Sequence, residues 1–181
     1  MIKLATDALR DALEDTFTGL KGIYNNWPGP EVKEQYPYMV VFMNRANVER
    51  MPYRLVKTLT DNSKLYSSGY FNIDLDVNYL ARGGQIEDQA AVLDRMSDFF
   101  NINLSLSNLK ETETSRDIPY EIQNYTATAN VRLLNISLDQ TGPDLQPGDR
   151  RSIFSLNMDA PRLKIENPTQ WRSYKIDPVI S

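Results

Sequence analysis

The alternation of apolar and polar residues is most regular between Tyr70 and Tyr79. Side chains on a strand point alternately to its two faces, so this pattern predicts a β-strand with one buried and one solvated face. The apolar set is Phe71, Ile73, Leu75, Val77 and Tyr79, and the polar set is Asn72, Asp74, Asp76 and Asn78. After Gly83-Gly84 the apolar spacing becomes helical. We expect this strand and the following helix to form the centre of an α+β core.

Two stretches have the spacing of amphipathic helices, with apolar residues three or four positions apart. The first covers 2–20, and its stripe is Ala5, Ala8, Leu9, Ala12, Leu13, Phe17 and Leu20. The second covers 86–100, and its stripe is Ile86, Ala90, Leu93, Met96 or Ser97, and Phe100. Each helix is expected to bury that stripe against the sheet.

Further strands are predicted on both sides of this centre. Residues 38–43 form a short apolar run, typical of a strand that is buried on both faces. Residues 125–138 alternate again, with a change of phase at Leu133-Leu134 that predicts a β-bulge. We expect this strand to be an antiparallel neighbour of 70–79. Residues 153–158 predict one more strand.

The remaining stretches predict a hairpin, a loop and an arm. Residues 48–69 predict a hairpin that projects beyond the main sheet, turns at Asp61-Asn62 and carries Arg50, Arg54, Lys57 and Lys64. Residues 110–117 are polar and predict an exposed loop. Residues 159–181 combine prolines with Trp171 and Tyr174, so we expect an arm that packs on this subunit or on a neighbour, after a single α+β domain over 1–158.

The composition excludes several classes of function. The 181 residues contain no cysteine and no histidine, which excludes disulfides, thiolate or imidazole metal sites and histidine-dependent catalysis. The net charge of −4 argues against a dedicated nucleic-acid binder, although a local basic patch stays possible. No apolar run approaches the roughly 20 residues that cross a bilayer, and the N-terminal stretch does not have the pattern of a signal peptide.

Candidate chemical sites are few. Asp74 and Asp76 have the spacing of cation ligands, but both belong to the solvated face of a regular strand. Glu111, Glu113, Asp117 and Glu121 would serve a carboxylate-dependent hydrolase only if two of them were held at a defined separation. A third possibility is a monomeric binding module with a pocket lined by Trp27, Tyr36, Tyr38 and Tyr53. We therefore expect no enzyme activity, no cofactor and no metal, and a function in protein contacts.

The order of these elements resembles the tail terminator or neck proteins of tailed bacteriophages. The resemblance rests on the N-terminal amphipathic helix (4–20), the Tyr-Pro-Tyr-led strand (36–43), the stretch GYFNIDLDVNYLARGGQIEDQAAVLDRMSDFF and the later strand YTATANVRL. It covers about residues 1–140 and depends on order and patterning, not on single residues.

The resemblance implies a structural virion protein, made in the host cytoplasm, that assembles into a hexameric ring at the head-proximal end of the tail. Its partners would be further copies of itself, the tail tube protein, head-tail connector or neck proteins and, in contractile tails, the sheath protein. DNA would pass through the lumen without specific binding, and no membrane is involved. Another connector or baseplate-side subunit is the alternative. The expected interface residues are Arg50, Arg54, Lys57, Lys64, Trp171 and Tyr174.

Overall fold

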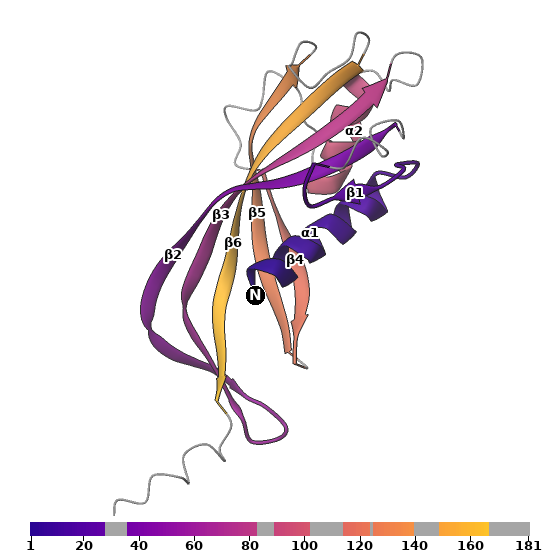
Figure 1. Ribbon diagram of the computed structural model, residues 1–181. Coiled ribbons are helices and arrows are strands. Elements are labelled where there is room, and N and C mark those ends of the chain that lie inside the picture. Colours follow the sequence, from indigo (N-terminus) through magenta and orange to yellow (C-terminus); the bar gives the residue numbers. More distant parts are fainter. Residues whose placement is uncertain (28–35, 83–88, 102–113, 124, 140–148, 167–181) are drawn as a thin grey trace, which may run out of the picture.

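A curled β-sheet wraps around two helices in the computed structural model, which describes residues 1–27, 36–82, 89–101, 114–123, 125–139 and 149–166 (Figure 1). The chain order is α1 (Ile2–Thr16), β1 (Ile23–Tyr24), β2 (Tyr38–Thr58), β3 (Lys64–Arg82), α2 (Gln89–Phe100), β4 (Thr114–Ile122), β5 (Tyr125–Asp139) and β6 (Asp149–Glu166). The prediction of an α+β fold with a mainly antiparallel sheet, an N-terminal helix and a central helix is confirmed.

The strands lie in the order β1-β2-β3-β6-β5-β4, and within these residues only the short β1–β2 contact is parallel. β3 pairs with β2 on one side and with β6 on the other over nearly its whole length. The prediction that 125–138 would lie beside 70–79 is therefore wrong, because β6 lies between them. β6 is much longer than 153–158, the run from which it was predicted. Its outward polar residues lie opposite the outward polar residues of β3.

The inner face of the sheet, the face that carries the two helices, holds the main core. Ile73, Leu75, Val77 and Tyr79 of β3 are buried there, and Phe71 is half-buried, as the alternation predicted. Their core partners from the helices are Ala5, Leu9 and Leu13 of α1 and Val92, Met96, Phe99 and Phe100 of α2. Burial of these side chains supplies most of the folding free energy, at about 1.5–3 kcal/mol for a large apolar side chain.

Both helices differ in detail from their predicted forms. α1 ends at Thr16, not at residue 20, and Gly19 follows with a φ of +92°. The buried stripe of α2 runs through Val92, Met96 and Phe99, whereas Leu93 is only half-buried. The stripe is rotated because Val92 and Phe99, seven residues apart, fill the core on the same side as Met96. Ile86 and the side chain of Ala90 lie outside the described residues.

Two arginines fasten the helices to their neighbours. Arg95 of α2 donates from Nη1 to the carbonyl oxygen of Thr18 at 2.9 Å, and its guanidinium lies 6.0 Å from the Phe17 ring centroid. Arg116 of β4 donates to the carbonyl oxygen of Phe99 and stacks 4.5 Å from that ring. A cation suits the last turn of α2, where unpaired carbonyl groups gather. The arginines thus tie α2 to the segment that follows α1 and to β4 of the sheet.

β2 is much longer than the apolar run that predicted it. Met39 and Val41 point into the main core, while Tyr38 and Val40 join a second cluster with Tyr36 and Leu80 on the outer face. Burial on both faces is thus confirmed for 38–41. It is wrong for Phe42 and Met43, which are exposed. Phe42 lies beyond the outer cluster, and Met43 borders a hollow at the start of α1.

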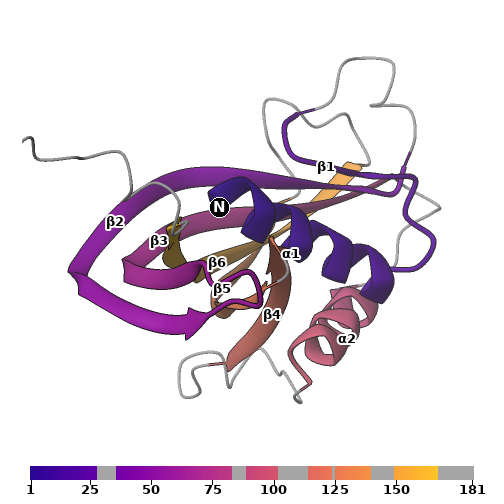
Figure 2. The ribbon, with the colours of Figure 1, turned by 90° about the horizontal axis from the view of Figure 1, so that it is seen from below.

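The predicted hairpin is the continuation of β2 and β3 beyond the core, with its turn near Asn62, which has a φ of +64°. Asp61 accepts hydrogen bonds from the backbone and hydroxyl of Ser63 and so fixes the turn. We name residues 42–70 the distal hairpin. Seen from below, it curls round toward β4 and β5 (Figure 2), and a register shift in β2 lies between Arg50 and Arg54.

Three other predictions are settled by the last strands. The loop predicted over 110–117 is wrong for 114–117, which belong to β4. Thr114, Ile118 and Tyr120 face the core, and Ser115 and Asp117 face out. The predicted bulge is confirmed, because the β5–β6 register skips Leu134. Residues 159–166, expected in the arm, are the second half of β6, and 167–181 lie outside the described residues.

The bend of the distal hairpin depends on Gly69. Its φ is +124°, and a Cβ atom there would lie 1.8 Å from the carbonyl oxygen of Glu49. We expect Gly69→Ala to lower the free energy of unfolding by at least roughly 1–3 kcal/mol, the cost of a strained backbone alone. Gly19→Ala is the matched control, since Gly19 also has a positive φ but open space around it. Urea unfolding in which both variants lose the same stability would contradict the role of the clash.

The end of the folded domain is predicted to be Glu166. Truncation after Met158 removes Ala160 and Leu163 from the core and removes the partner of β3 residues 64–72. Because loss of a single buried leucine side chain costs about 2–5 kcal/mol, we expect this truncation to unfold a domain of ordinary stability. Truncation after Glu166 should retain a cooperative thermal transition in circular dichroism. A folded 1–158 fragment would show that the second half of β6 is dispensable.

Candidate protein interface

The β2 strand of the distal hairpin is exposed along its whole length. Every residue of β2 from Phe42 to Thr58 is exposed, including Tyr53 with 62% of its surface accessible. The exposed apolar side chains on this strand are Phe42, Met43, Val48, Met51, Tyr53, Leu55 and Val56. An apolar surface of this extent on a single element is typical of a region that contacts another molecule.

The outer edge of β2 is also open. β1 pairs only with Met39 and Val40, so within the described residues the edge from Val41 to Thr58 has no strand beside it. An open edge offers unpaired backbone groups to a strand of another chain. Register shifts after Met43, Arg50 and Leu55 interrupt this edge, which limits indiscriminate pairing.

The charge of the distal hairpin is opposite to that of the whole chain. It contains five basic and two acidic residues in a protein with a net charge of −4. The predicted interface residues Arg50, Arg54, Lys57 and Lys64 are all exposed on it. Trp171 and Tyr174 lie outside the described residues. The structure therefore brings the four basic residues together on one element and leaves the two aromatic ones untested.

β6 contributes one more cation that sequence reasoning missed. Lys164 donates to Glu166 at 2.9 Å and lies 5.8 Å from the ring centroid of Tyr53. The hydrogen bond to Glu166 is the main cause that raises the pKa of Lys164 above its usual value. No local signal in the sequence links residues 53 and 164, because only the strand pairing brings them close.

A groove lies between the distal hairpin and the β4–β5 hairpin, and we name it the hairpin groove. Its volume is about 750 Å³, within the range of about 300–1,000 Å³ of pockets that bury ligands. Tyr53, Leu55, Tyr125, Pro161 and Leu163 are among the side chains that line it. The sequence indicated none of this, since the lining comes from four strands that are distant in the chain.

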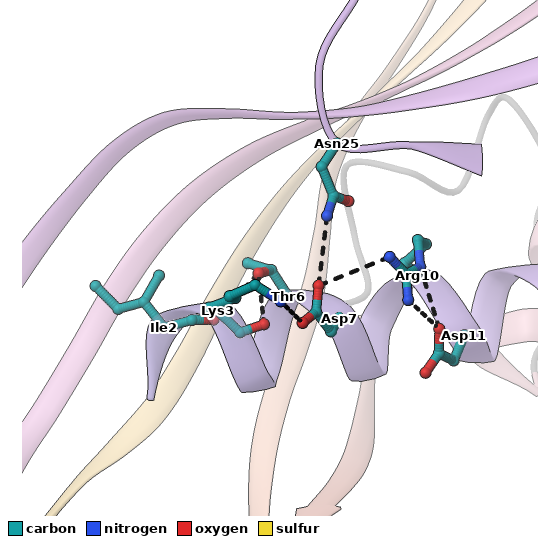
Figure 3. A network of polar contacts seen from close by, with 7 residues as sticks. All are labelled: Ile2, Lys3, Thr6, Asp7, Arg10, Asp11 and Asn25. Atoms are coloured by element: carbon teal, nitrogen blue, oxygen red, sulfur yellow. Dashed lines mark hydrogen bonds and ion pairs between the residues drawn. The ribbon is translucent and has the colours of Figure 1, made fainter.

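A smaller hollow of about 450 Å³ lies where the start of α1 meets β2. Figure 3 shows the polar network at its rim, in which Asp7 accepts hydrogen bonds from Lys3 and, at 3.4 Å, from Asn25. Arg10 lies 3.8 Å from the same carboxylate and bonds Asp11. The hydrogen bond from Lys3 is the main cause that lowers the pKa of Asp7. This network ties α1 to the segment that precedes β2.

The outer face of the sheet carries a polar ladder across four strands. Asp76 accepts hydrogen bonds of 2.8 Å from Asn44 of β2 and Ser155 of β6. Asp74 accepts one of 2.8 Å from Asn157. Asp159 of β6 accepts from Asn72 at 2.7 Å and from Arg132 of β5 at 2.8 Å. The prediction that Asp74 and Asp76 belong to a solvated face is supported, and both carboxylates are already engaged by protein donors.

No family model and no curated protein matches this sequence. Any proposal for the function therefore rests on the surfaces described above. Within the described residues, no three acidic side chains converge in a way that could hold a metal ion. Neither helix in the described part of the chain is long and apolar enough to cross a membrane.

The described members of the alternative sites from the sequence do not converge. Asp117 and Glu121 are exposed on β4 and bond Asn130 and Thr126, while Glu111 and Glu113 lie outside the described residues. Tyr36 and Tyr38 are packed together with a ring separation of 5.3 Å. Tyr53 lies fifteen positions further along β2, roughly 50 Å for an extended strand. These aromatic residues do not line one pocket.

The Asp7 network predicts a pH-dependent contribution to stability. Because the folded-state pKa of Asp7 is lowered, its stabilising effect is present above the pKa of an unfolded aspartate, about 3.9, and is lost as the pH falls through the folded value. We expect Asp7→Asn to lower the melting temperature slightly at pH 7 and to have a smaller effect at pH 3. Asp15→Asn, on the same helix outside this network, is the control. An equal loss at both pH values would contradict the role of the charge.

Proposed function

We propose that this chain is a structural virion protein that forms a ring at the head-proximal end of a phage tail, where it terminates tube polymerisation and joins the tail to the head connector. The observation that carries the proposal is the distal hairpin, in which β2 is exposed on both faces while the neighbouring β3 stays joined to a well-packed core. The order of elements that resembles tail terminator proteins supplies the particular role.

Self-association is supported by the charge distribution. The basic distal hairpin belongs to a chain whose remaining residues are strongly acidic, so the hairpin of one copy and the body of the next attract each other. The apolar side chains on the same hairpin then supply the surface to be buried. The charge attraction and the burial of apolar surface both favour contact between copies of this chain over isolated monomers.

Ring formation is supported by the difference between the two sheet edges. One edge is β2, long and open over 41–58, and the other is β4, which pairs only with β5 among the described strands. A head-to-tail ring requires two unlike surfaces on each subunit, whereas a twofold dimer requires one surface that matches itself. Contact between unlike edges is the arrangement that closes into a ring.

The proposal predicts that the distal hairpin is needed for assembly and not for folding. We expect Val48→Asp combined with Arg50→Glu to abolish rings on tail tubes, because it places charge on an exposed apolar position and reverses a basic one. The melting temperature should change little, since both side chains are exposed. Electron microscopy of the purified chain with tail tubes, together with native mass measurement, checks both parts.

The matched control is Leu134→Asp combined with Arg150→Glu, which changes the same kinds of residue at exposed positions outside the distal hairpin. This control should form rings like the parent chain. A parent chain that stays monomeric and never associates with tubes would overturn the proposal. Rings located at the baseplate end would instead assign the chain to another tail subunit.

A further inference from the structure

The sheet divides into two parts below the point where β5 and β6 separate. Their pairing ends at Asn130 and Asp159. Beyond it, among the described residues, β6 pairs only with β3 and β5 pairs only with β4. Figure 1 shows β6 running down with β3 while β5 runs down with β4. Residues 160–166 and 125–129 therefore present toward each other two edges that no described strand covers, and on the β6 edge the Leu163 N–H donates to the Met1 sulfur at 3.2 Å.

The hairpin groove lies at this division. Tyr125 and Thr128 of β5 line one side, and Pro161 and Leu163 of β6 line the other. The curled distal hairpin closes it with Tyr53 and Leu55. A groove with apolar walls and two strand edges has the features that bind an extended peptide, because the edges supply main-chain hydrogen bonds and the walls cover side chains.

The chain itself supplies such a peptide at this place. β6 ends at Glu166, three residues after the groove residue Leu163, and fifteen residues follow. They begin with Asn167-Pro168, a pair that favours a turn, and continue with Trp171, Tyr174 and Ile176. Residues 160–166 and 171–177 are of equal length, each roughly 24 Å as a strand. A turn at 167–170 would bring the second stretch back along the first.

We propose that residues 167–181 occupy the hairpin groove of their own chain, as an added strand antiparallel to β6 between β6 and β5. The short connection favours the chain's own segment over that of another copy, because a tethered segment has a local concentration on the order of millimolar. The added strand pairs the two open edges and covers the apolar walls of the groove. This inference is independent of the role in the virion.

Disulfide trapping in the full chain tests the proposal, because the protein contains no cysteine of its own. Thr128→Cys, at an exposed groove position, is combined in turn with a single cysteine at each position from 171 to 176. A disulfide needs Cα atoms less than about 7 Å apart, and a strand rises about 3.3 Å per residue, so we expect intramolecular disulfides at one position or at two alternate positions only. Ser137→Cys, exposed on the same strand and nine residues away, is the control and should trap none.

Each other outcome overturns the proposal. Disulfides only between molecules would assign the groove to the segment of another copy. Equal trapping at all six positions would show a segment that is not held as a strand, and absence of trapping would leave the groove to a different occupant. Fluorescence gives an independent measurement: in Trp27→Phe, the emission of Trp171 should be shifted to shorter wavelength, and an unshifted emission would contradict burial in the groove.

Discussion

The fold depends on the central position of β3. This strand is hydrogen-bonded to β2 and β6 along nearly all of its length, and its inward residues meet both helices in one core. Its outward residues Asn72, Asp74 and Asp76 bond side chains of the neighbouring strands. Both faces of β3 therefore depend on its strict alternation. A shift of one residue would expose the core side chains and bury the carboxylates.

The same strand explains how the exposed part of β2 can stay folded. Beyond residue 70 toward the turn, β3 is still paired with β2 on one side and with β6 on the other, and Leu65 is buried in the main core cluster. Three strands form the smallest sheet that is stable without much packing, particularly when it is continuous with a larger one. The core therefore supports the distal hairpin through strand continuity, and leaves its side chains available for contact.

The sequence predicted those features that depend on local periodicity. The buried and solvated faces of β3, the two helices, the bulge at Leu134 and the hairpin turn near Asn62 all follow from neighbours in the chain. It failed where pairing decided the outcome. β6 was taken as six residues and the position of β5 was misjudged, because the polar stretch after Met158 forms a strand only with β3 beside it. The hairpin groove and the contact of Lys164 with Tyr53 were beyond prediction, since each joins residues that only the sheet order brings close.

An exposed apolar edge of this length would normally favour aggregation, and the chain limits that risk in two ways. The register shifts along β2 break the edge into short lengths, so an arbitrary strand cannot pair with all of it. The basic residues on the distal hairpin repel the same hairpin of another molecule but attract an acidic surface. A partner must therefore match both an interrupted edge and a positive charge. The acidic body of a neighbouring copy meets the second requirement, which favours ordered contact between unlike surfaces over pairing of two identical hairpins.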